Sequence, residues 1–148
     1  MIWLGVVVIV AALAGVIVRG RRRASRLRRA RDVAEELLPE IRAVMESADP
    51  ASSTEGEPAS TTHYRAVCEH LPQVLSGEQY FAVETFYHCV ESYRDARAVM
   101  IEAFAEDDER SLGDRIRAKD RRDRCLKDVY YTGHGAVEKL EEILTSAS

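Results

Sequence analysis

The most unusual local sequence is Gly133-His134-Gly135, which follows two adjacent tyrosines, Tyr130 and Tyr131. Two glycines inside a helix cost roughly 1 kcal/mol each relative to alanine, a cost that close packing, a local break or a ligand would offset. A histidine between glycines has the chemistry for proton transfer or pH sensing, because its pKa lies near neutrality. Close packing is the simpler interpretation, since helix glycines often mark a close contact.

These residues define a candidate ligand or packing site that consists of His88, Tyr130, Tyr131, Gly133 and His134. The sequence offers the histidines no recognisable nucleophile or orienting partner. It also contains no Gly-rich phosphate loop, catalytic-triad signature or dinucleotide fingerprint. We therefore assign no catalytic residues, and the pattern favours a protein that is not an enzyme.

The histidines and cysteines lack the spacing of a metal centre. Structural zinc needs ligand pairs such as CxxC or HxxxH that converge on one ion. His88 and Cys89 are adjacent, so on a helix they point about 100° apart. Cys68, Cys89 and Cys125 form no CxxC pair and fit a reducing compartment. We predict no metal and no cofactor, and we expect the many carboxylates to form a solvated acidic face.

The first 18 residues are predicted to form a transmembrane anchor. Ile2 to Val18 are seventeen residues without a charge, which span roughly 25 Å as a helix, near the lower limit for a bilayer. Trp3 occupies the position of an interfacial aromatic anchor. A cleaved signal peptide is disfavoured because no basic segment precedes the apolar run and Arg19 and Gly20 begin a basic one.

A basic flank follows the predicted anchor. It holds eight arginines and no acid: Arg19, Arg21, Arg22, Arg23, Arg26, Arg28, Arg29 and Arg31. The other 13 basic side chains stand against all 25 acidic ones, so residues 32–148 carry a formal charge of −12. Lys and Arg flanks stay cytoplasmic, which predicts an inner-membrane protein with its N-terminus outside. The flank suits anionic lipid headgroups, whereas the acidic body disfavours nucleic acid.

The predicted anchor continues into a juxtamembrane helix over residues 19–48, where apolar residues recur at three- and four-residue steps. Pro39 is expected to kink or break this helix. Residues 49–62 are rich in proline, serine, threonine and glycine, which predicts a flexible linker. Residues 63–148 then form the predicted acidic cytoplasmic domain. It begins with a short helix that ends at Leu71-Pro72.

The main element of this domain is predicted to be a long antiparallel helical hairpin. Its first helix runs from Gly77 to about Asp108 behind a capping box at Ser76. Its second runs from about Leu112 to Thr145. The expected apolar seams are Val83, Phe86, Val90, Tyr93, Met100 and Phe104 on the first helix, and Leu112, Ile116, Leu126, Val129, Gly133, Val137, Leu140 and Leu144 on the second.

In this register Phe86 faces Gly133, which makes room for its ring. No segment shows strand alternation, so the predicted fold class is all-α. The architecture favours a single-pass membrane protein that presents a helical interaction or scaffold module, with a protein partner or self-association. The alternative is a ligand-sensing or enzymatic helical domain centred on Tyr130–His134.

Overall fold

The structure is a computed structural model that describes residues 2–48, 59–105 and 111–146, with side chains from residue 20 onward. Every regular element in these ranges is helical, which confirms the predicted all-α class. The elements are α1 (Ile2–Ser47), α2 (Thr62–Val67), the 3-10 turn η1 (Cys68–His70), α3 (Leu71–Val74), α4 (Gly77–Ala103) and α5 (Leu112–Ser146).

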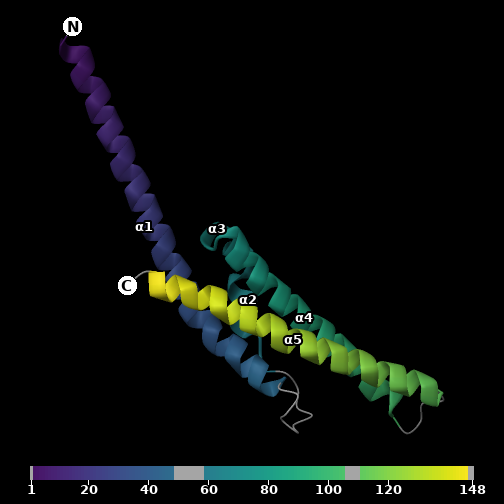
Figure 1. Ribbon diagram of the computed structural model, residues 1–148. Helices are drawn as coiled ribbons and strands as arrows, with labels where there is room; N and C mark the ends of the chain where they lie inside the picture. Colours follow the sequence, from purple (N-terminus) through teal and green to yellow (C-terminus); the bar gives the residue numbers. More distant parts are fainter. Residues whose placement is uncertain (1, 49–58, 106–110, 147–148) are drawn as a thin grey trace.

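Helix α1 runs without interruption from Ile2 to Ser47, and its N-terminal part projects away from the other helices (Figure 1). Pro39 lies inside this helix and does not break it. Among the residues described with their side chains, no helix is long and apolar enough to cross a membrane. The predicted anchor, residues 1–18, lies outside those residues, as do residues 49–58 of the predicted linker.

Helices α4 and α5 form the predicted antiparallel hairpin and pack along each other (Figure 1). The capping box is confirmed: Ser76 Oγ accepts a hydrogen bond from the backbone N–H of Gln79, and the Gln79 side chain accepts one from Ser76 N–H. Helix α5 begins and ends within one residue of the predicted bounds, whereas α4 ends earlier than predicted, at Ala103.

The C-terminal half of α1 forms one core with the hairpin. Ala34, Leu37, Ile41 and Val44 are fully buried, and they share a cluster with buried residues of α4 and α5. Residues 19–48 were predicted to form a juxtamembrane helix and not part of the core. Positions 34, 37, 41 and 44 lie on one face of α1. Residues of α4 and α5 cover this apolar face.

The short helices between α1 and α4 differ from the predicted single helix over residues 63–71. Pro72 starts a new turn instead of following a helix end, because it lies in the first turn of α3, where its missing N–H costs no hydrogen bond. Arg26 of α1 holds the end of this turn. Its guanidinium donates to the carbonyl oxygens of Val74 and Leu75, at 3.3 and 2.9 Å.

Gly133 is a close contact between α5 and the rest of the core. A Cβ atom added there would lie 2.5 Å from Met45 Cγ of α1 and 3.2 Å from Phe86 Cε2 of α4. The predicted pairing of Phe86 with Gly133 is therefore confirmed, and Met45 is an additional neighbour that the sequence did not suggest. A Cβ added at Gly135 would meet nothing within 4 Å. Packing thus explains the first glycine and not the second.

The predicted seam is buried in the middle of the hairpin and open at the end where α4 and α5 join. Val83, Phe86, Val90, Val129 and Leu140 are buried as expected. The prediction is wrong for three seam residues at the joined end, Phe104, Leu112 and Ile116, which are half or more exposed. The intervening α5 segment, residues 117–124, is almost wholly charged, so it offers little apolar surface to close the seam.

We predict opposite effects of alanine at the two glycines. Gly135→Ala should raise the free energy of unfolding by up to about 1 kcal/mol, because alanine favours the helix and has free space there. Gly133→Ala gains the same propensity but forces Met45 and Phe86 apart, which typically costs about 1–3 kcal/mol. Both variants gain the same helix propensity. The free energy of unfolding of Gly133→Ala, measured by chemical denaturation, should therefore be lower than that of Gly135→Ala by about the overpacking cost. Equal stabilities would contradict the close contact.

Candidate functional site

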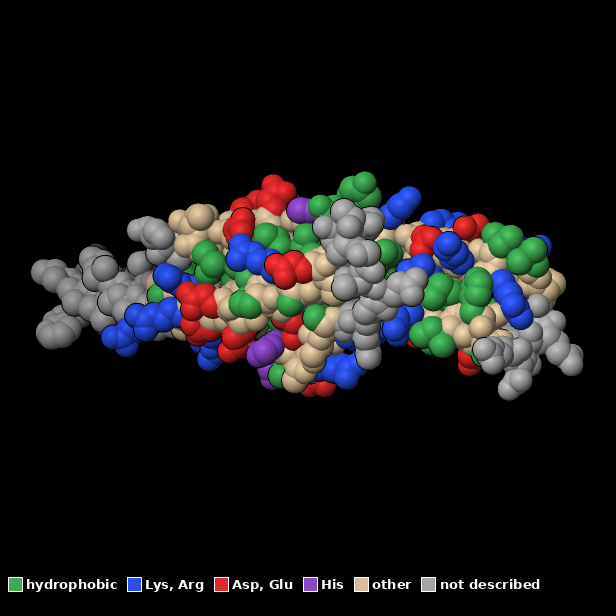
Figure 2. Space-filling model, turned by 90° about the horizontal axis from the view of Figure 1, so that it is seen from below, with side chains coloured by type: hydrophobic (Ala, Val, Ile, Leu, Met, Phe, Trp, Pro, Cys, Tyr) green, Lys and Arg blue, Asp and Glu red, His purple; other side chains and the backbone are tan. Residues whose placement is uncertain are grey.

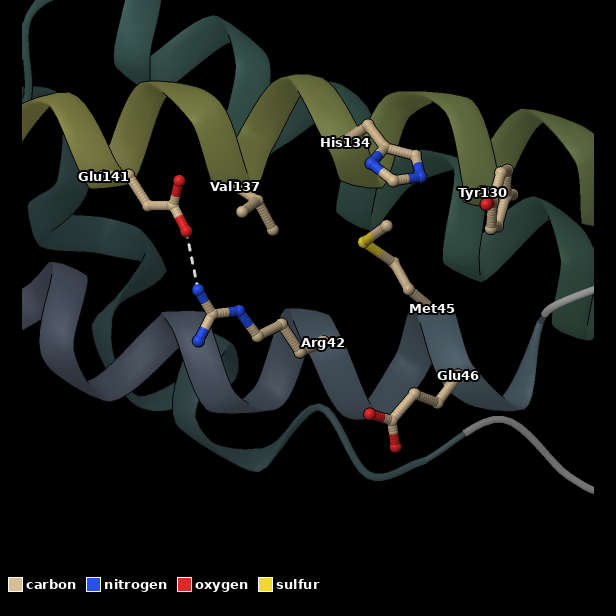
Figure 3. Close-up of a pocket in the computed structure, with 7 residues that line it drawn as sticks. All are labelled: Arg42, Met45, Glu46, Tyr130, His134, Val137 and Glu141. Atoms are coloured by element: carbon tan, nitrogen blue, oxygen red, sulfur yellow. Dashed lines mark hydrogen bonds and ion pairs between the residues drawn. The ribbon is translucent and has the colours of Figure 1, made fainter.

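A groove with a volume of about 310 Å³ lies between α1 and α5 (Figure 3). Four α5 residues at steps of 4, 3 and 4 share one helix face, and three α1 residues lie opposite them. The lining residues are Arg42, Met45, Glu46, Tyr130, His134, Val137 and Glu141. The groove exists because Gly133, next to His134, lets α5 approach α1 closely.

The groove combines an aromatic side, an apolar floor and charged ends. The rings of Tyr130 and His134 meet edge to face, with centroids 4.8 Å apart. Met45 and Val137 supply the apolar surface (Figure 3). At one end Arg42 Nη2 lies 2.6 Å from Glu141 Oε1, an exposed ion pair that contributes little to stability.

The chemistry of the lining favours binding over catalysis. None of the seven lining residues is a serine, threonine or cysteine that His134 would activate as a nucleophile. One Arg and two Glu side chains leave the groove with a net negative charge when His134 is neutral. Figure 3 shows His134 and Tyr130 side by side on α5, with the Met45 side chain reaching toward α5 from α1.

The structure brings together two of the five residues of the sequence-derived candidate site. Tyr130 and His134 line the groove, and Gly133 faces the core beside them. Tyr131 is 72% exposed, and its ring and that of Tyr130 meet edge to face, with centroids 5.8 Å apart. His88 is an exposed residue of α4 and does not line the groove. Tyr130 and His134 are four residues apart on α5, whereas local sequence spacing holds no information on the α1 side of the groove.

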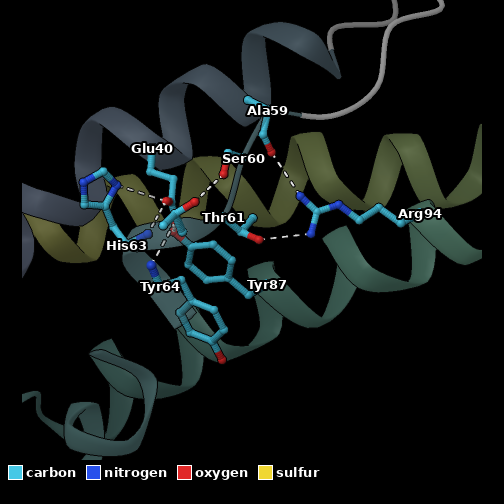
Figure 4. Close-up of polar contacts among 9 residues, drawn as sticks. Glu40, Ala59, Ser60, Thr61, His63, Tyr64, Tyr87 and Arg94 are labelled. Carbon is cyan, nitrogen blue, oxygen red and sulfur yellow. Dashed lines mark hydrogen bonds and ion pairs between the residues drawn. The ribbon is translucent and has the colours of Figure 1, made fainter. Parts of the chain in front are cut away.

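A second polar centre, which the sequence analysis missed, surrounds the buried carboxylate of Glu40 on α1 (Figure 4). Its side chain is 4% exposed. Oε1 accepts hydrogen bonds from the Tyr87 hydroxyl at 2.7 Å and from the backbone N–H of Tyr64 at 3.2 Å. Oε2 accepts one from the backbone N–H of His63 at 2.8 Å and lies 3.2 Å from His63 Nδ1.

Glu40 therefore caps α2 from another helix. The first N–H groups of a helix have no partner within it, and a carboxylate there also meets the positive end of the helix dipole. Thr61 precedes α2, but its side chain makes no cap hydrogen bond. Its Oγ1 instead accepts a hydrogen bond from Arg94 of α4, at 3.0 Å, while Arg94 also donates to the Ala59 carbonyl, at 3.1 Å.

Aromatic stacking completes this centre. The rings of Tyr64 and Tyr87 are parallel, with centroids 3.7 Å apart, so α2 lies directly on α4 (Figure 4). The available sequence signal was a charged residue inside an apolar stripe, since Glu40 lies between Leu37 and Ile41, both fully buried. A buried carboxylate requires hydrogen-bond donors, but the sequence does not show which residues supply them.

The thiols are placed as structural side chains. Burial raises the pKa of Cys89, partly opposed by a hydrogen bond with Thr132, so the neutral thiol is favoured. Cys89 and Cys125 are near each other, and both pack against the core. Within residues 2–48, 59–105 and 111–146, no group of three or more His, Cys, Asp and Glu side chains is arranged to hold a metal ion.

We predict that Tyr87 makes the protein sensitive to alkaline pH. Burial, and then the hydrogen bond to Glu40, raise the pKa of the Tyr87 phenol above its ordinary value. Its contribution to stability is therefore complete below about pH 10, where the unfolded phenol titrates, and falls by up to about 1.4 kcal/mol per pH unit above it. Tyr87→Phe should lower the free energy of unfolding by about 1–3 kcal/mol at pH 7, since the bond to a charged acceptor is lost.

The measurement is urea unfolding of both proteins at pH 7, 9, 10 and 11. The stability difference should shrink above pH 10, because the variant lacks this phenol. Both curves should still fall somewhat, since burial also raises the pKa of Tyr64. Tyr131→Phe, at an exposed position, is the control and should follow the wild type. Parallel wild-type and Tyr87→Phe curves would contradict the prediction.

Comparison with known proteins adds no family to this description: the chain matches no family model, no curated protein and no solved structure. Two arrangements of the described residues bear on function, the groove beside Tyr130 and His134 and the polar centre around Glu40.

Proposed function

We propose that this protein is a single-pass membrane-anchored scaffold, which presents a helical interaction module at the cytoplasmic face of the membrane. The observation that supports it most is the continuity of α1. One helix of 46 residues contains the uncharged segment 2–18 and, at its other end, fully buried core residues such as Leu37 and Val44. Such a helix is about 70 Å long, enough to span a bilayer and still enter the domain core.

A continuous helix restricts the movement of the domain relative to its anchor. A flexible linker would let the domain swing freely, whereas an uninterrupted helix transmits the anchor's direction into the core. In this proposal the predicted linker over residues 49–62 connects elements within the cytoplasmic region, because the residues on both sides of it pack together. Tyr64 on its C-terminal side packs against the same core that contains Val44 on its N-terminal side.

The arginines of the basic flank divide into two groups. Arg26 is used within the fold on the end of α3, and Arg31 pairs with Glu35 at 2.8 Å. Five others with described side chains are exposed: Arg21, Arg22, Arg23, Arg28 and Arg29. Each basic side chain near an anionic membrane surface contributes about 1 kcal/mol of binding free energy. The exposed group supports both the proposed orientation and contact with lipid headgroups.

We predict that the full chain is recovered in the membrane fraction, resists carbonate extraction and is released by detergent. On intact spheroplasts, an N-terminal tag should be accessible to added protease and a C-terminal tag should be protected. Replacing the five exposed arginines by glutamine should retain the chain in the membrane but mix its orientation, because the charge bias that sets topology is lost.

The control for this experiment is Arg65→Gln with Arg124→Gln. Both arginines are exposed and lie more than forty residues beyond the predicted span in the sequence. Only basic residues within about 15–20 positions of a span end set its orientation, so this control should keep the wild-type topology. Recovery of the wild-type chain in the soluble fraction would refute the anchor, and a C-terminal tag open to protease would refute the orientation.

The groove supports a second candidate function, the binding of a small aromatic amine. Tyr130 offers an aromatic face to a cation, Met45 and Val137 offer apolar surface, and Glu46 offers a carboxylate, while Arg42 is already paired with Glu141. These groups are typical of a binding site for a small ligand, and they are the specific observation in favour of ligand sensing.

A thermal-shift screen with small aromatic amines tests this candidate. A ligand at one hundred times its dissociation constant should stabilise the protein by about 2.7 kcal/mol. Tyr130→Ala and Glu46→Gln should abolish or weaken that shift. Tyr131→Ala is the matched control, because Tyr131 is an exposed neighbour that does not line the groove. A shift that survives Tyr130→Ala would place binding elsewhere, and the absence of any shift would reject the candidate.

A further inference from the structure

Seven residues of α5 form a stripe on the side of the helix that the rest of the chain leaves exposed, here called the α5 stripe. They follow one another at alternating steps of three and four, which keeps them on one side of a helix. The stripe consists of Arg121, Arg124, Asp128, Tyr131, Gly135, Glu138 and Glu142, all of them exposed. The buried residues of α5, among them Val129, Ala136 and Leu140, lie on the other side.

Two members of the stripe are unusual for a helix surface that meets only water. Gly135 lies inside α5, where glycine costs roughly 1 kcal/mol relative to alanine. A Cβ atom added there would meet nothing within 4 Å. One turn earlier, the side chain of Tyr131 is 72% exposed. Packing within the chain explains neither residue, whereas a partner helix that approaches closely over Gly135 and covers Tyr131 explains both.

Charge along the stripe changes sign from one end to the other. Its N-terminal part holds Arg121 and Arg124, and its C-terminal part holds Glu138 and Glu142, with Tyr131 between the two parts. Figure 2 shows this separation along its upper edge, where Asp and Glu side chains gather on the left and Lys and Arg side chains predominate on the right. A surface with this pattern is attracted to a copy of itself that runs in the opposite direction.

We propose that the α5 stripe is a self-association surface, which pairs with the same stripe of a second copy of this chain so that the two α5 helices are antiparallel. A twofold interface sets one surface against itself, so opposite charges must lie at equal distances on either side of the axis. With the axis at Tyr131, Arg124 is seven positions before it and Glu138 is seven positions after it. Arg124 of each copy therefore faces Glu138 of the other.

The same register accounts for the other stripe residues. Arg121, ten positions before the axis, faces Glu142, eleven positions after it. Asp128, three positions before the axis, faces Gly135, four positions after it, so this carboxylate meets open space and no opposing acid. A parallel pair would set arginine against arginine and glutamate against glutamate. The charges therefore select the antiparallel arrangement.

The inference names the partner of the interaction module, and it rests on the proposed function for its role, although its contacts belong to α5 and not to the anchor. Exposed ion pairs are individually weak and are screened by salt, so the dimer should dissociate as the salt concentration rises. Glu142 Oε1 already lies 2.8 Å from Lys139 Nζ of its own chain. The pair of Arg124 with Glu138 is therefore the better one to test.

The test is sedimentation equilibrium of the full chain in micelles of an uncharged detergent. The wild type should dimerise at about 0.01 M salt and dissociate at about 1 M, where the Debye length is about tenfold shorter. Arg124→Glu and Glu138→Arg should each raise the dissociation constant about tenfold or more, because either change replaces two attractive pairs by two repulsive ones. The double variant should recover wild-type dimerisation. Lys119→Glu is the matched control, since it reverses an exposed charge on a different side of α5 and should leave the dimer intact.

Mixing the two single variants gives the sharpest outcome. In a mixed dimer the altered position 124 of one chain faces the altered position 138 of the other, and the second pair is unchanged, so both pairs are attractive. The mixture should therefore dimerise more tightly than either variant alone. Circular dichroism should show unchanged helix content in every variant, because the altered side chains are on the surface.

A monomeric wild type would overturn the proposal. So would a dimer that Arg124→Glu leaves intact, because association would then occur elsewhere, for example through the anchor. A mixture no tighter than its components would overturn the antiparallel register, and with it the proposal. Dimerisation in micelles is measured independently of membrane fractionation, so failure of the membrane proposal and failure of the dimer are distinguishable.

Discussion

The carboxylate of Glu40 sets the main constraint on how the helices assemble. Removing a charged carboxylate from water costs several kcal/mol unless donors replace the water. Three donors do so here, the backbone N–H groups of His63 and Tyr64 and the Tyr87 hydroxyl, and His63 Nδ1 lies 3.2 Å from the carboxylate. These donors belong to α2 and α4, whereas Glu40 belongs to α1. Any arrangement that separates these three helices leaves either the carboxylate or the start of α2 without partners, so the hydrogen bonds select one relative placement.

The apolar core extends this constraint along α1. Residues on both sides of Glu40, including Leu37 and Ile41, are fully buried, so the helix cannot rotate without exposing them. Helix α5 then approaches α1 closely at Gly133, where the absence of a side chain leaves room for Met45 and Phe86. The groove beside Tyr130 and His134 is a consequence of this approach. The candidate site therefore lies beside a close helix contact, and its α1 wall belongs to the same helix as Glu40.

Packing weakens from the middle of the hairpin toward its joined end. Tyr93, Ala96 and Ala103 continue the buried side of α4, but on α5 only Ala118 is buried among the described residues 112–128. The charged segment 117–124 cannot supply apolar side chains to both faces of the hairpin. Leu112 and Ile116, which precede this segment, remain exposed, whereas Leu126 beyond it packs against the core.

Local patterns in the sequence determined the helices themselves. Apolar periodicity predicted the all-α class and the two hairpin helices, the Ser76–Gln79 box fixed where α4 begins, and a glycine on the seam of α5 predicted the contact with Phe86. These features depend on residues a few positions apart or on the regular geometry of a helix pair. They also related Tyr130 to His134, which lie one turn apart on α5.

Tertiary structure alone decided which distant residues meet. The donors to Glu40 lie 23, 24 and 47 residues after it in the chain, so no local pattern identifies them. The same holds for the placement of α1 in the core, for Met45 beside Gly133 and for the α1 side of the groove. An amphipathic pattern predicts that one face of a helix is buried, but it does not identify the helix that packs against that face. That choice depends on the summed burial, hydrogen bonding and steric fit of the whole chain.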